Sequence, residues 1–177
     1  MKVIAFAASN SIKSINKQLV QYATKFIDTK GVEIIDINDF DLPIYSSDLE
    51  EKFGVPEAAN AFLSKISEAD ALLISYAEHN GGYTVAYKNL FDWASRINMK
   101  VYQNKPVVML STSPGASGAS RVLKTAIDSA HFFDGIVVAS MSLPGFYENF
   151  NSEAGELTDD NLKEQLKRTV GAINQLA

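Results

Sequence analysis

The chain opens with Val3-Ile4-Ala5-Phe6-Ala7-Ala8, which runs directly into Ser9-Asn10-Ser11-Ile12-Lys13-Ser14-Ile15-Asn16. A continuous apolar run of this length that ends in small polar residues is typical of a strand buried on both faces. From Ile15 to Lys30 the apolar residues recur at gaps of three and four, which predicts a helix with Gly31 at its C-terminal cap. A buried strand, a polar loop and a helix form the first unit of a parallel α/β sheet.

The same order of strand, loop and helix repeats along the chain. Apolar runs predict further strands at residues 32–37, 71–76, 106–112 and 135–140, and helical periodicity predicts helices from Pro56, over 85–96 and over 120–133. We expect residues 39–53 to be irregular, since Pro43 blocks regular pairing, and a last helix to follow Thr158 as its cap. Five such strands predict an α/β fold: a doubly wound parallel sheet of order 2-1-3-4-5, with helices on both faces, in a single domain over residues 1–177.

Composition excludes several classes of protein. The 177 residues carry 16 Lys and Arg against 21 Asp and Glu, and this net charge of −5 argues against a nucleic-acid-binding surface. The chain has no cysteine, which excludes disulfides, thiolate nucleophiles and cysteine-ligated zinc, and with two histidines we expect no metal site. The apolar run at the amino terminus is too short for a signal peptide, and no run is long enough to span a membrane. We therefore expect a cytoplasmic protein without a membrane partner.

The loops after the first, third and fourth strands form the candidate site, because ligands bind at the carboxyl ends of the strands in a sheet of this order. The first loop, residues 9–16, offers hydroxyls, amides and free backbone N–H groups at the start of a helix, which is a favourable place for a phosphate. It is neither a Walker A sequence nor a three-glycine dinucleotide motif. A polar turn that only caps the helix is the alternative.

The second loop, Ala77-Glu78-His79-Asn80-Gly81-Gly82-Tyr83-Thr84, contains an Asn-Gly-Gly run that favours a tight turn and lets backbone amides approach a ligand. His79 beside Glu78 is a weak candidate for acid–base chemistry, since no partner serine is evident from the spacing. The third loop, Ser111-Thr112-Ser113-Pro114-Gly115-Ala116-Ser117-Gly118, is another segment of small residues. Together the loops predict a polar trough that ends in a phosphate pocket and suits a mononucleotide-like cofactor. Taken singly, each is also explained as an ordinary connector.

These loops resemble those of the NADPH-dependent FMN reductase family, flavodoxin-fold enzymes that include quinone, azo-dye and chromate reductases. Ser9, Ser14 and Asn16 match the family's first loop, Glu78-His79-Asn80-Gly81 is similar to its second, and Ser113-Pro114-Gly115 to its third. Two further segments carry the resemblance, which extends from Val3 to about Ser140: Leu42-Pro43-Ile44-Tyr45-Ser46-Ser47-Asp48-Leu49 and Tyr87-Lys88-Asn89-Leu90-Phe91-Asp92-Trp93.

The resemblance implies a flavodoxin-like oxidoreductase that binds FMN. Such an enzyme passes hydride from NADPH or NADH through the flavin to a small-molecule acceptor, such as a quinone, an azo dye, a metal or free flavin, by a ping-pong mechanism. The chemistry belongs to the cofactor, so we expect no catalytic side chain. The residues expected to bind the cofactor are Ser9, Ser11, Ser14, Ile15, Asn16, Ala77, Glu78, His79, Asn80, Gly81, Ser113, Pro114, Gly115 and Gly118.

Three of these positions depart from the family pattern. Ser11 stands where the family usually has arginine, and this removes a bidentate phosphate contact whose charge alone Lys13 could replace. Ala77 replaces a proline, and His79 replaces a tyrosine that lies near the flavin in the family. These departures concern FMN affinity and substrate preference more than the identity of the cofactor.

From the sequence, two other classes of protein stay open: a flavodoxin-type electron carrier without NAD(P)H turnover, and a non-enzymatic module of the same fold. The sequence distinguishes neither NADPH from NADH nor one acceptor from another. The helix that carries Tyr87, Leu90, Phe91, Trp93 and Ile97 is apolar on more than one face, which predicts a homodimer or homotetramer. Burial of this helix under residues 39–53 is the alternative.

Overall fold

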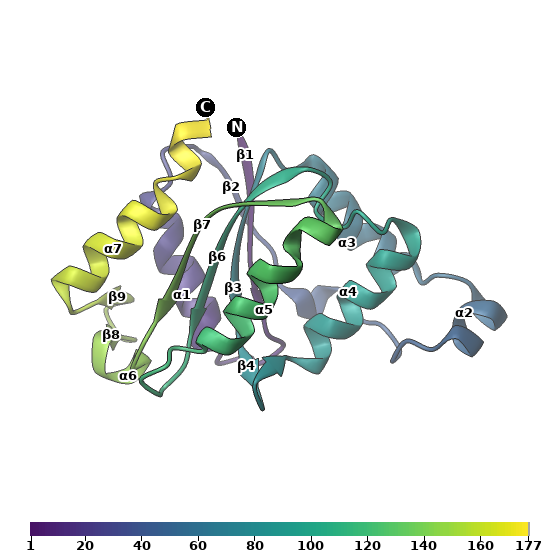
Figure 1. Ribbon diagram of the computed structural model, residues 1–177, viewed down its shortest axis with the longest axis horizontal. Coiled ribbons are helices and arrows are strands. Elements are labelled where there is room, and N and C mark those ends of the chain that lie inside the picture. The colour runs from purple at the N-terminus through teal and green to yellow at the C-terminus, as the bar shows by residue number, and fades with distance from the viewer. Residues whose placement is uncertain (177) are drawn as a thin grey trace.

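Five parallel strands form the central layer of the structure, a computed structural model that describes residues 1–176 (Figure 1). The spatial order is β2-β1-β3-β6-β7, which confirms the predicted order 2-1-3-4-5. Ala8 pairs with Tyr76 and Tyr76 with Ser111, so the carboxyl ends of the three central strands finish level with one another. The strands are β1 (Lys2–Ala8), β2 (Gly31–Ile34), β3 (Ala71–Tyr76), β6 (Lys105–Thr112) and β7 (Gly135–Leu143).

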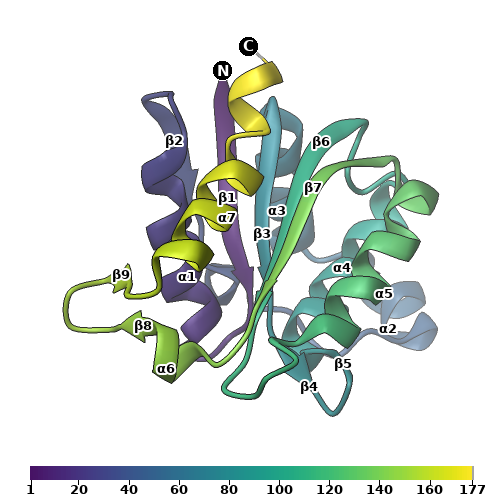
Figure 2. The ribbon, with the colours of Figure 1, turned by 60° about the vertical axis from the view of Figure 1, so that its left-hand side comes forward.

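Helices cover both faces of the sheet. Figure 2 shows α1 (Ile15–Ala23) and α7 (Asp160–Val170) on one face and α3 (Glu57–Glu68), α4 (Val85–Ile97) and α5 (Ser120–Ala130) on the other. The side chains of β1 alternate between the two apolar cores that result, so the apolar run at the start of the chain is buried on both sides. The helices therefore bury both faces of the central strands and leave the ends of these strands exposed.

Two predicted boundaries near β2 are wrong, and local hydrogen bonds explain both. The first helix gives way to a 3₁₀ turn, η1 (Thr24–Phe26), and Gly31 begins β2 instead of capping that helix. The second strand ends at Ile34, because the Asp36 side chain accepts a hydrogen bond from Asn38 N and starts a further 3₁₀ turn, η2 (Ile37–Asp39).

Other short elements also differ from the predictions. The segment 39–53 contains α2 (Ser47–Phe53), which Ser46 caps by accepting a hydrogen bond from Leu49 N. The cap of α7 is Asp159 and not Thr158. The predicted fourth helix ends at Ala130 and continues as η3 (His131–Phe133). The elements that the sequence did not predict are the hairpin strands β4 (Glu78–His79) and β5 (Gly82–Tyr83), helix α6 (Phe146–Asn149), strands β8 (Phe150–Asn151) and β9 (Glu156–Leu157), and η4 (Ile173–Leu176).

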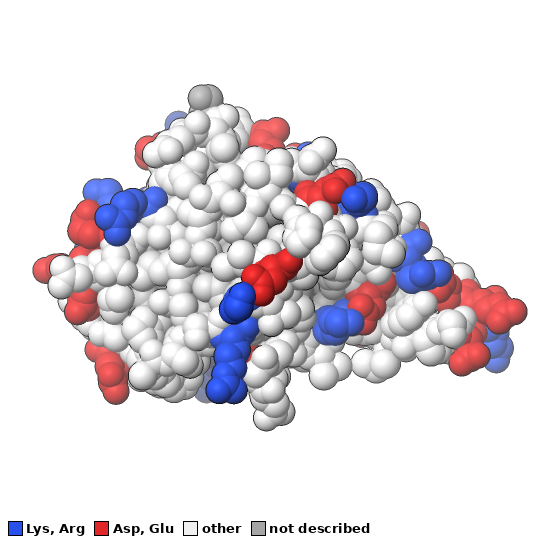
Figure 3. Space-filling model, viewed as in Figure 1, with Lys and Arg blue, Asp and Glu red and all other residues white. Residues whose placement is uncertain are grey.

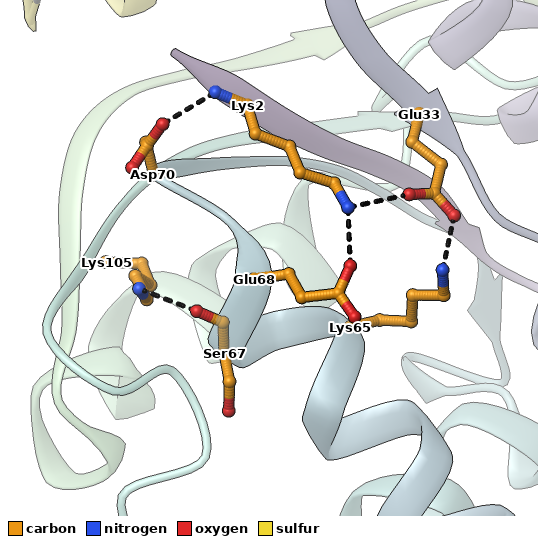
Figure 4. Close-up of polar contacts among 7 residues, drawn as sticks. All are labelled: Lys2, Glu33, Lys65, Ser67, Glu68, Asp70 and Lys105. Atoms are coloured by element: carbon orange, nitrogen blue, oxygen red, sulfur yellow. Dashed lines mark hydrogen bonds and ion pairs between the residues drawn. The ribbon is translucent and has the colours of Figure 1, made fainter.

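An ion-pair cluster joins β1, β2 and α3 at the amino edge of the sheet (Figure 4). Lys2 Nζ contacts the carboxylates of Glu68 and Glu33, and Lys65 Nζ lies 2.7 Å from Glu33 Oε1. Hydrogen bonds from these lysines hold the pKa values of Glu33 and Glu68 below their usual range and raise the pKa of Lys2. The pairs are solvent-exposed, so their contribution to stability is small.

Within residues 1–176, no helix is both long enough and apolar enough to cross a membrane. The same residues contain no group of three or more His, Asp or Glu side chains placed to hold a metal ion.

Candidate functional site

Three loops meet at the carboxyl edge of the sheet, at the bottom of the views in Figures 1 and 2. They follow β1, β3 and β6, which are neighbours in the sheet. The structure therefore brings the three predicted segments, residues 9–16, 77–84 and 111–118, to one edge. This is the edge where ligands bind in doubly wound sheets.

The first loop presents hydrogen-bond donors at the start of α1. Ser14 is the N-cap, and its Oγ accepts a hydrogen bond from Lys17 N at 3.2 Å. Among the described residues, the backbone N–H groups of Lys13, Ile15 and Asn16 donate no hydrogen bond. The hydroxyls of Ser9 and Ser14 are free to donate as well, and residues 9–16 include no carboxylate. Donors of this kind at a helix N-terminus fit a phosphate group.

The Asn16 side chain has a different role from the one that its place in the loop suggests. It is 2% exposed, and its Oδ1 accepts hydrogen bonds from Ser75 Oγ at 2.7 Å and from Thr112 N at 3.0 Å. Its Nδ2 donates to Thr112 O at 3.1 Å. The side chain thus ties the start of α1 to the ends of β3 and β6, and the backbone N–H of Asn16 is left for a ligand.

The second loop folds as a two-residue hairpin between β4 and β5. Asn80 and Gly81 have φ angles of 52° and 82°, as a type I′ turn requires, so the positive φ angles expected from the Asn-Gly-Gly run are present. The Thr84 hydroxyl donates to Ala8 O at 3.0 Å and caps α4. A threonine just before a helical apolar pattern is a recognised cap signal, so this role of Thr84 could have been predicted from the sequence.

Glu78 links the second loop to the third. Its Oε2 accepts a hydrogen bond from Val122 N at 3.0 Å in the first turn of α5. The helix needs this bond because its own cap, Ala119, has no side-chain acceptor. The Glu78 carboxylate is therefore engaged with α5 instead of orienting His79, which lies exposed on the hairpin.

The third loop is fixed against the end of β7. Ser142 Oγ donates to Ser117 O and Gly118 O, at 2.9 Å and 2.8 Å. A Cβ on Gly118, whose φ is 56°, would lie 2.6 Å from the Leu143 carbonyl, so no other residue fits there without a shift. Gly118 is thus buried beneath the loop, while Pro114 and Gly115 are exposed at its tip.

A pocket of about 340 Å³ opens between the first and second loops and the segment after β2. Asn10, Asp41 and His79 lie on its lining. Its outer wall is held in place by α4: Asn89 Oδ1 accepts a hydrogen bond from Tyr45 N at 2.8 Å, and Trp93 Nε1 donates to Pro43 O at 2.8 Å. Two of the sequence signatures, residues 42–49 and 87–93, thus build one pocket wall together.

Four tyrosines cluster at the hairpin of the second loop: Tyr83 belongs to β5, and its ring packs against those of Tyr76 and Tyr87. The Tyr102 hydroxyl lies 3.2 Å from those of Tyr76 and Tyr87, and all three side chains are buried. Burial raises the pKa of Tyr102 to about 12, and it raises the pKa values of Tyr76 and Tyr87 well above the usual 10. Burial also raises the pKa of Tyr83. These phenols therefore stay protonated at physiological pH and support the hairpin as a neutral hydrogen-bonded layer.

The other residues that were predicted to bind the cofactor offer mainly backbone groups to the site. Ile15 is half-buried against the core under α1, and Ala77 is buried at the end of β3. Ser11 is exposed, and its N–H donates to Ser9 Oγ at 3.3 Å.

Charged side chains of both signs are scattered over the face in Figure 3, with acidic ones gathered around α2 at the right.

Comparisons with known proteins agree on one family. The sequence pattern of the NADPH-dependent FMN reductase family matches residues 1–147. The chain is 35% identical over 133 residues to a 2-hydroxy-1,4-benzoquinone reductase of Burkholderia, covering 74% of this chain and 67% of that protein. It is 28% identical over 178 residues to an NAD(P)H-dependent FMN reductase of Pseudomonas aeruginosa, covering 98% and 93%. The structure is similar to that of FerB, a flavoenzyme NAD(P)H:(acceptor) oxidoreductase of Paracoccus denitrificans, with a TM-score of 0.77, 25% identity and coverage of 99% and 97%.

Proposed function

The chain belongs to the NADPH-dependent FMN reductase family, and from this premise we propose how its carboxyl-edge loops bind the cofactor and in what order the substrates enter. It is an NAD(P)H-dependent oxidoreductase with FMN as its cofactor. FMN, when bound, would supply the chemistry of hydride transfer from the nicotinamide and of electron transfer to a second substrate.

The FMN phosphate would bind at the start of α1. The observation that carries this proposal is the set of free backbone N–H groups at Lys13, Ile15 and Asn16, beside the hydroxyls of Ser9 and Ser14. Hydrogen bonds from such donors to an anion are stronger than neutral ones. Lys13 adds a positive charge in the same loop, where the family arginine is replaced by Ser11. The flavin ring would lie against residues 78–81 and 113–118, held mainly by backbone groups.

Replacing Ser14 by alanine is expected to weaken FMN binding about tenfold or more, since a hydrogen bond to a charged group contributes roughly 1.5–3 kcal/mol. The same change removes a helix cap, which costs about 1 kcal/mol of folding stability. Titration of the apoprotein with FMN, followed by flavin fluorescence, measures the affinity.

Ser46→Ala is the matched control for Ser14→Ala. Ser46 caps α2 with the same geometry, accepting a hydrogen bond from Leu49 N at 3.2 Å, and it lies outside the three loops. Both variants should lose similar stability, but only Ser14→Ala should lose FMN affinity. Equal FMN affinities in the two variants would count against a phosphate at α1.

Nicotinamide and acceptor would use one opening in succession. The three loops enclose one side of the proposed ring site, and the chain has no dinucleotide motif that could hold the nucleotide elsewhere at the same time. The oxidised nucleotide must then leave before a quinone or another small acceptor enters. We expect parallel double-reciprocal plots when the concentration of NAD(P)H is varied at several fixed concentrations of a benzoquinone. Intersecting lines would refute the shared opening, and a yellow protein that neither nucleotide bleaches would refute the proposed activity itself.

The site also has a candidate side chain for acceptor choice. His79 is exposed at the pocket rim, on the hairpin that would frame the flavin. His79→Ala should change the relative kcat/KM values for quinones and azo dyes while leaving FMN bound. Unchanged ratios across such a panel would remove His79 from this role.

We propose a homodimer that pairs through α4 and α5. Residues 42–45 cover Trp93, so one apolar face of α4 is buried within the chain and is not available for pairing. A second apolar surface supports the proposal: a pocket of about 210 Å³ between α4 and α5, with Phe91, Phe133 and Thr125 on its lining.

Thr125→Arg should block this surface and give a monomer. Thr125 is exposed, so the change leaves the core intact, and Ser152→Arg in the exposed turn between β8 and β9 is a control of equal charge and size. Sedimentation velocity at micromolar concentration should show a dimer for the parent and for Ser152→Arg. A parent chain that sediments as a monomer would reject the dimer.

A further inference from the structure

We infer that this enzyme uses NADH in preference to NADPH, because the pocket next to the proposed flavin site offers a carboxylate and no cation to the group that distinguishes the two nucleotides. The inference rests on the proposed function, since it concerns the hydride donor of that reaction. The inferred preference for NADH differs from the NADPH dependence after which the family is named.

The pocket of about 340 Å³ is the concave surface that adjoins the proposed ring site. Asn10 of the first loop and His79 of the second lie on its lining, so a nucleotide whose nicotinamide reaches the loops can extend into it. Other hollows in the described part of the chain lie along α1 and α7, between α1 and the β8–β9 hairpin, and on the far side of α4, where Lys88 and Asp92 are on the lining. None of these four includes Asn10 of the first loop, so we place the remainder of the nucleotide in the pocket of about 340 Å³, where it meets the segment after β2.

That segment is acidic. No lysine or arginine occurs in residues 35–51, whereas six carboxylates do: Asp36, Asp39, Asp41, Asp48, Glu50 and Glu51. Asp41 is exposed on the pocket lining, and within residues 1–176 its carboxylate neither forms an ion pair nor accepts a hydrogen bond. The lining of the pocket contains no Lys or Arg.

The nearby cations are engaged or lie elsewhere. Lys17 forms an ion pair with Asp36, whose pKa lies below its usual value because hydrogen bonds from Lys17 and Asn38 outweigh the effect of burial. Lys88, in the groove on the other side of α4, contacts both carboxylate oxygens of Asp92 at 2.7 Å. Lys13 lies in the proposed phosphate loop, where the FMN phosphate would neutralise it. Arg121 lies at the start of α5 and is not part of the pocket lining.

NADPH differs from NADH only in a phosphate on the adenosine ribose. Proteins that select NADPH place an arginine or lysine at this phosphate, and proteins that select NADH place a carboxylate where it accepts a hydrogen bond from the ribose hydroxyl. A phosphate next to Asp41 would meet a like charge without a compensating cation, and such contacts reject a ligand. Asp41 is thus placed as the acceptor for a ribose hydroxyl.

The decisive measurement is the ratio of kcat/KM for NADH to kcat/KM for NADPH, with one quinone as acceptor. We expect about tenfold or more in favour of NADH, and the ratio should fall as salt screens the charges. Asp41→Arg should raise kcat/KM for NADPH about tenfold and reduce or reverse the preference. Asp48→Arg, an identical change of charge in α2 outside the pocket, should leave the ratio unchanged.

A binding measurement provides a readout that is independent of turnover. In isothermal titration calorimetry, ADP-ribose should bind the parent protein more tightly than 2′-phospho-ADP-ribose, and Asp41→Arg should reverse this order. A kcat/KM for NADPH equal to or higher than that for NADH would overturn the inference while leaving the proposed function intact. Loss of activity with NADPH in Arg121→Ala would do the same, because it would mean that Arg121 binds the ribose phosphate. Failure of both nucleotides to reduce the flavin would instead overturn the proposed function and the inference with it.

Discussion

Asn16→Ala is expected to lower the free energy of unfolding by about 3 kcal/mol or more, because each buried polar group left without a partner costs roughly 1–3 kcal/mol. The change removes three hydrogen bonds at once. It leaves three buried groups without these partners: the Ser75 hydroxyl and the backbone N–H and C=O of Thr112. Urea denaturation of the apoprotein measures the loss. The variant should also bind FMN less tightly, since the start of α1 is no longer held against β3 and β6.

The control for Asn16→Ala is Asn10→Ala. Asn10 lies in the same loop but is exposed, so its removal should leave the stability of the apoprotein nearly unchanged. If Asn16→Ala unfolded at the same urea concentration as the parent and lost only FMN affinity, its side chain would be a cofactor ligand and not a structural tie. The two outcomes separate because stability is measured without the cofactor.

The position of Asn16 at the start of a helix could be predicted from the sequence, but the contacts of its side chain could not. The residues around it predict a strand, a loop and a helix start because continuous apolar runs and helical periodicity are properties of the local sequence. The edge at which the three loops meet follows from the strand order. Which atoms of Asn16 face a ligand depends on Ser75 and Thr112, which lie 59 and 96 residues away, and no local pattern contains that information.

The errors at element ends have the same cause. The second strand was predicted to reach residue 37, but the Asp36 side chain binds Asn38 N and ends the strand at Ile34. Helix α2 was missed because Pro43 indicates irregular structure, although Ser46 is a cap signal that could have revealed it. The Glu78 carboxylate binds Val122 N across two loops, so the predicted contact of Glu78 with the cofactor is left to its backbone. Side chains that bond to the backbone, locally or across loops, decide such details.

Trp93→Ala should cost about 3–5 kcal/mol of stability, the usual range for removing a buried tryptophan. It should also raise the KM for the nicotinamide nucleotide, because Trp93 holds residues 42–45 as the wall of the pocket in which we place that nucleotide. The indole is 1% exposed and packs edge-on against Tyr45, with ring centroids 5.0 Å apart. Steady-state kinetics and urea denaturation of the same preparation measure the two effects.

Two controls separate packing from pocket geometry. Leu166→Ala removes a fully buried side chain from α7 on the opposite face, so it should cost about 2–5 kcal/mol of stability while leaving the KM of the folded enzyme unchanged. Trp93→Phe keeps most of the ring and loses the hydrogen bond to Pro43 O, so it should cost about 1 kcal/mol. If KM stayed at the parent value in Trp93→Ala, the signature around Trp93 would serve folding alone. A rise in KM in Trp93→Ala but not in Leu166→Ala would mean that this residue, which touches no substrate in our proposal, acts on nucleotide binding through the backbone that it holds.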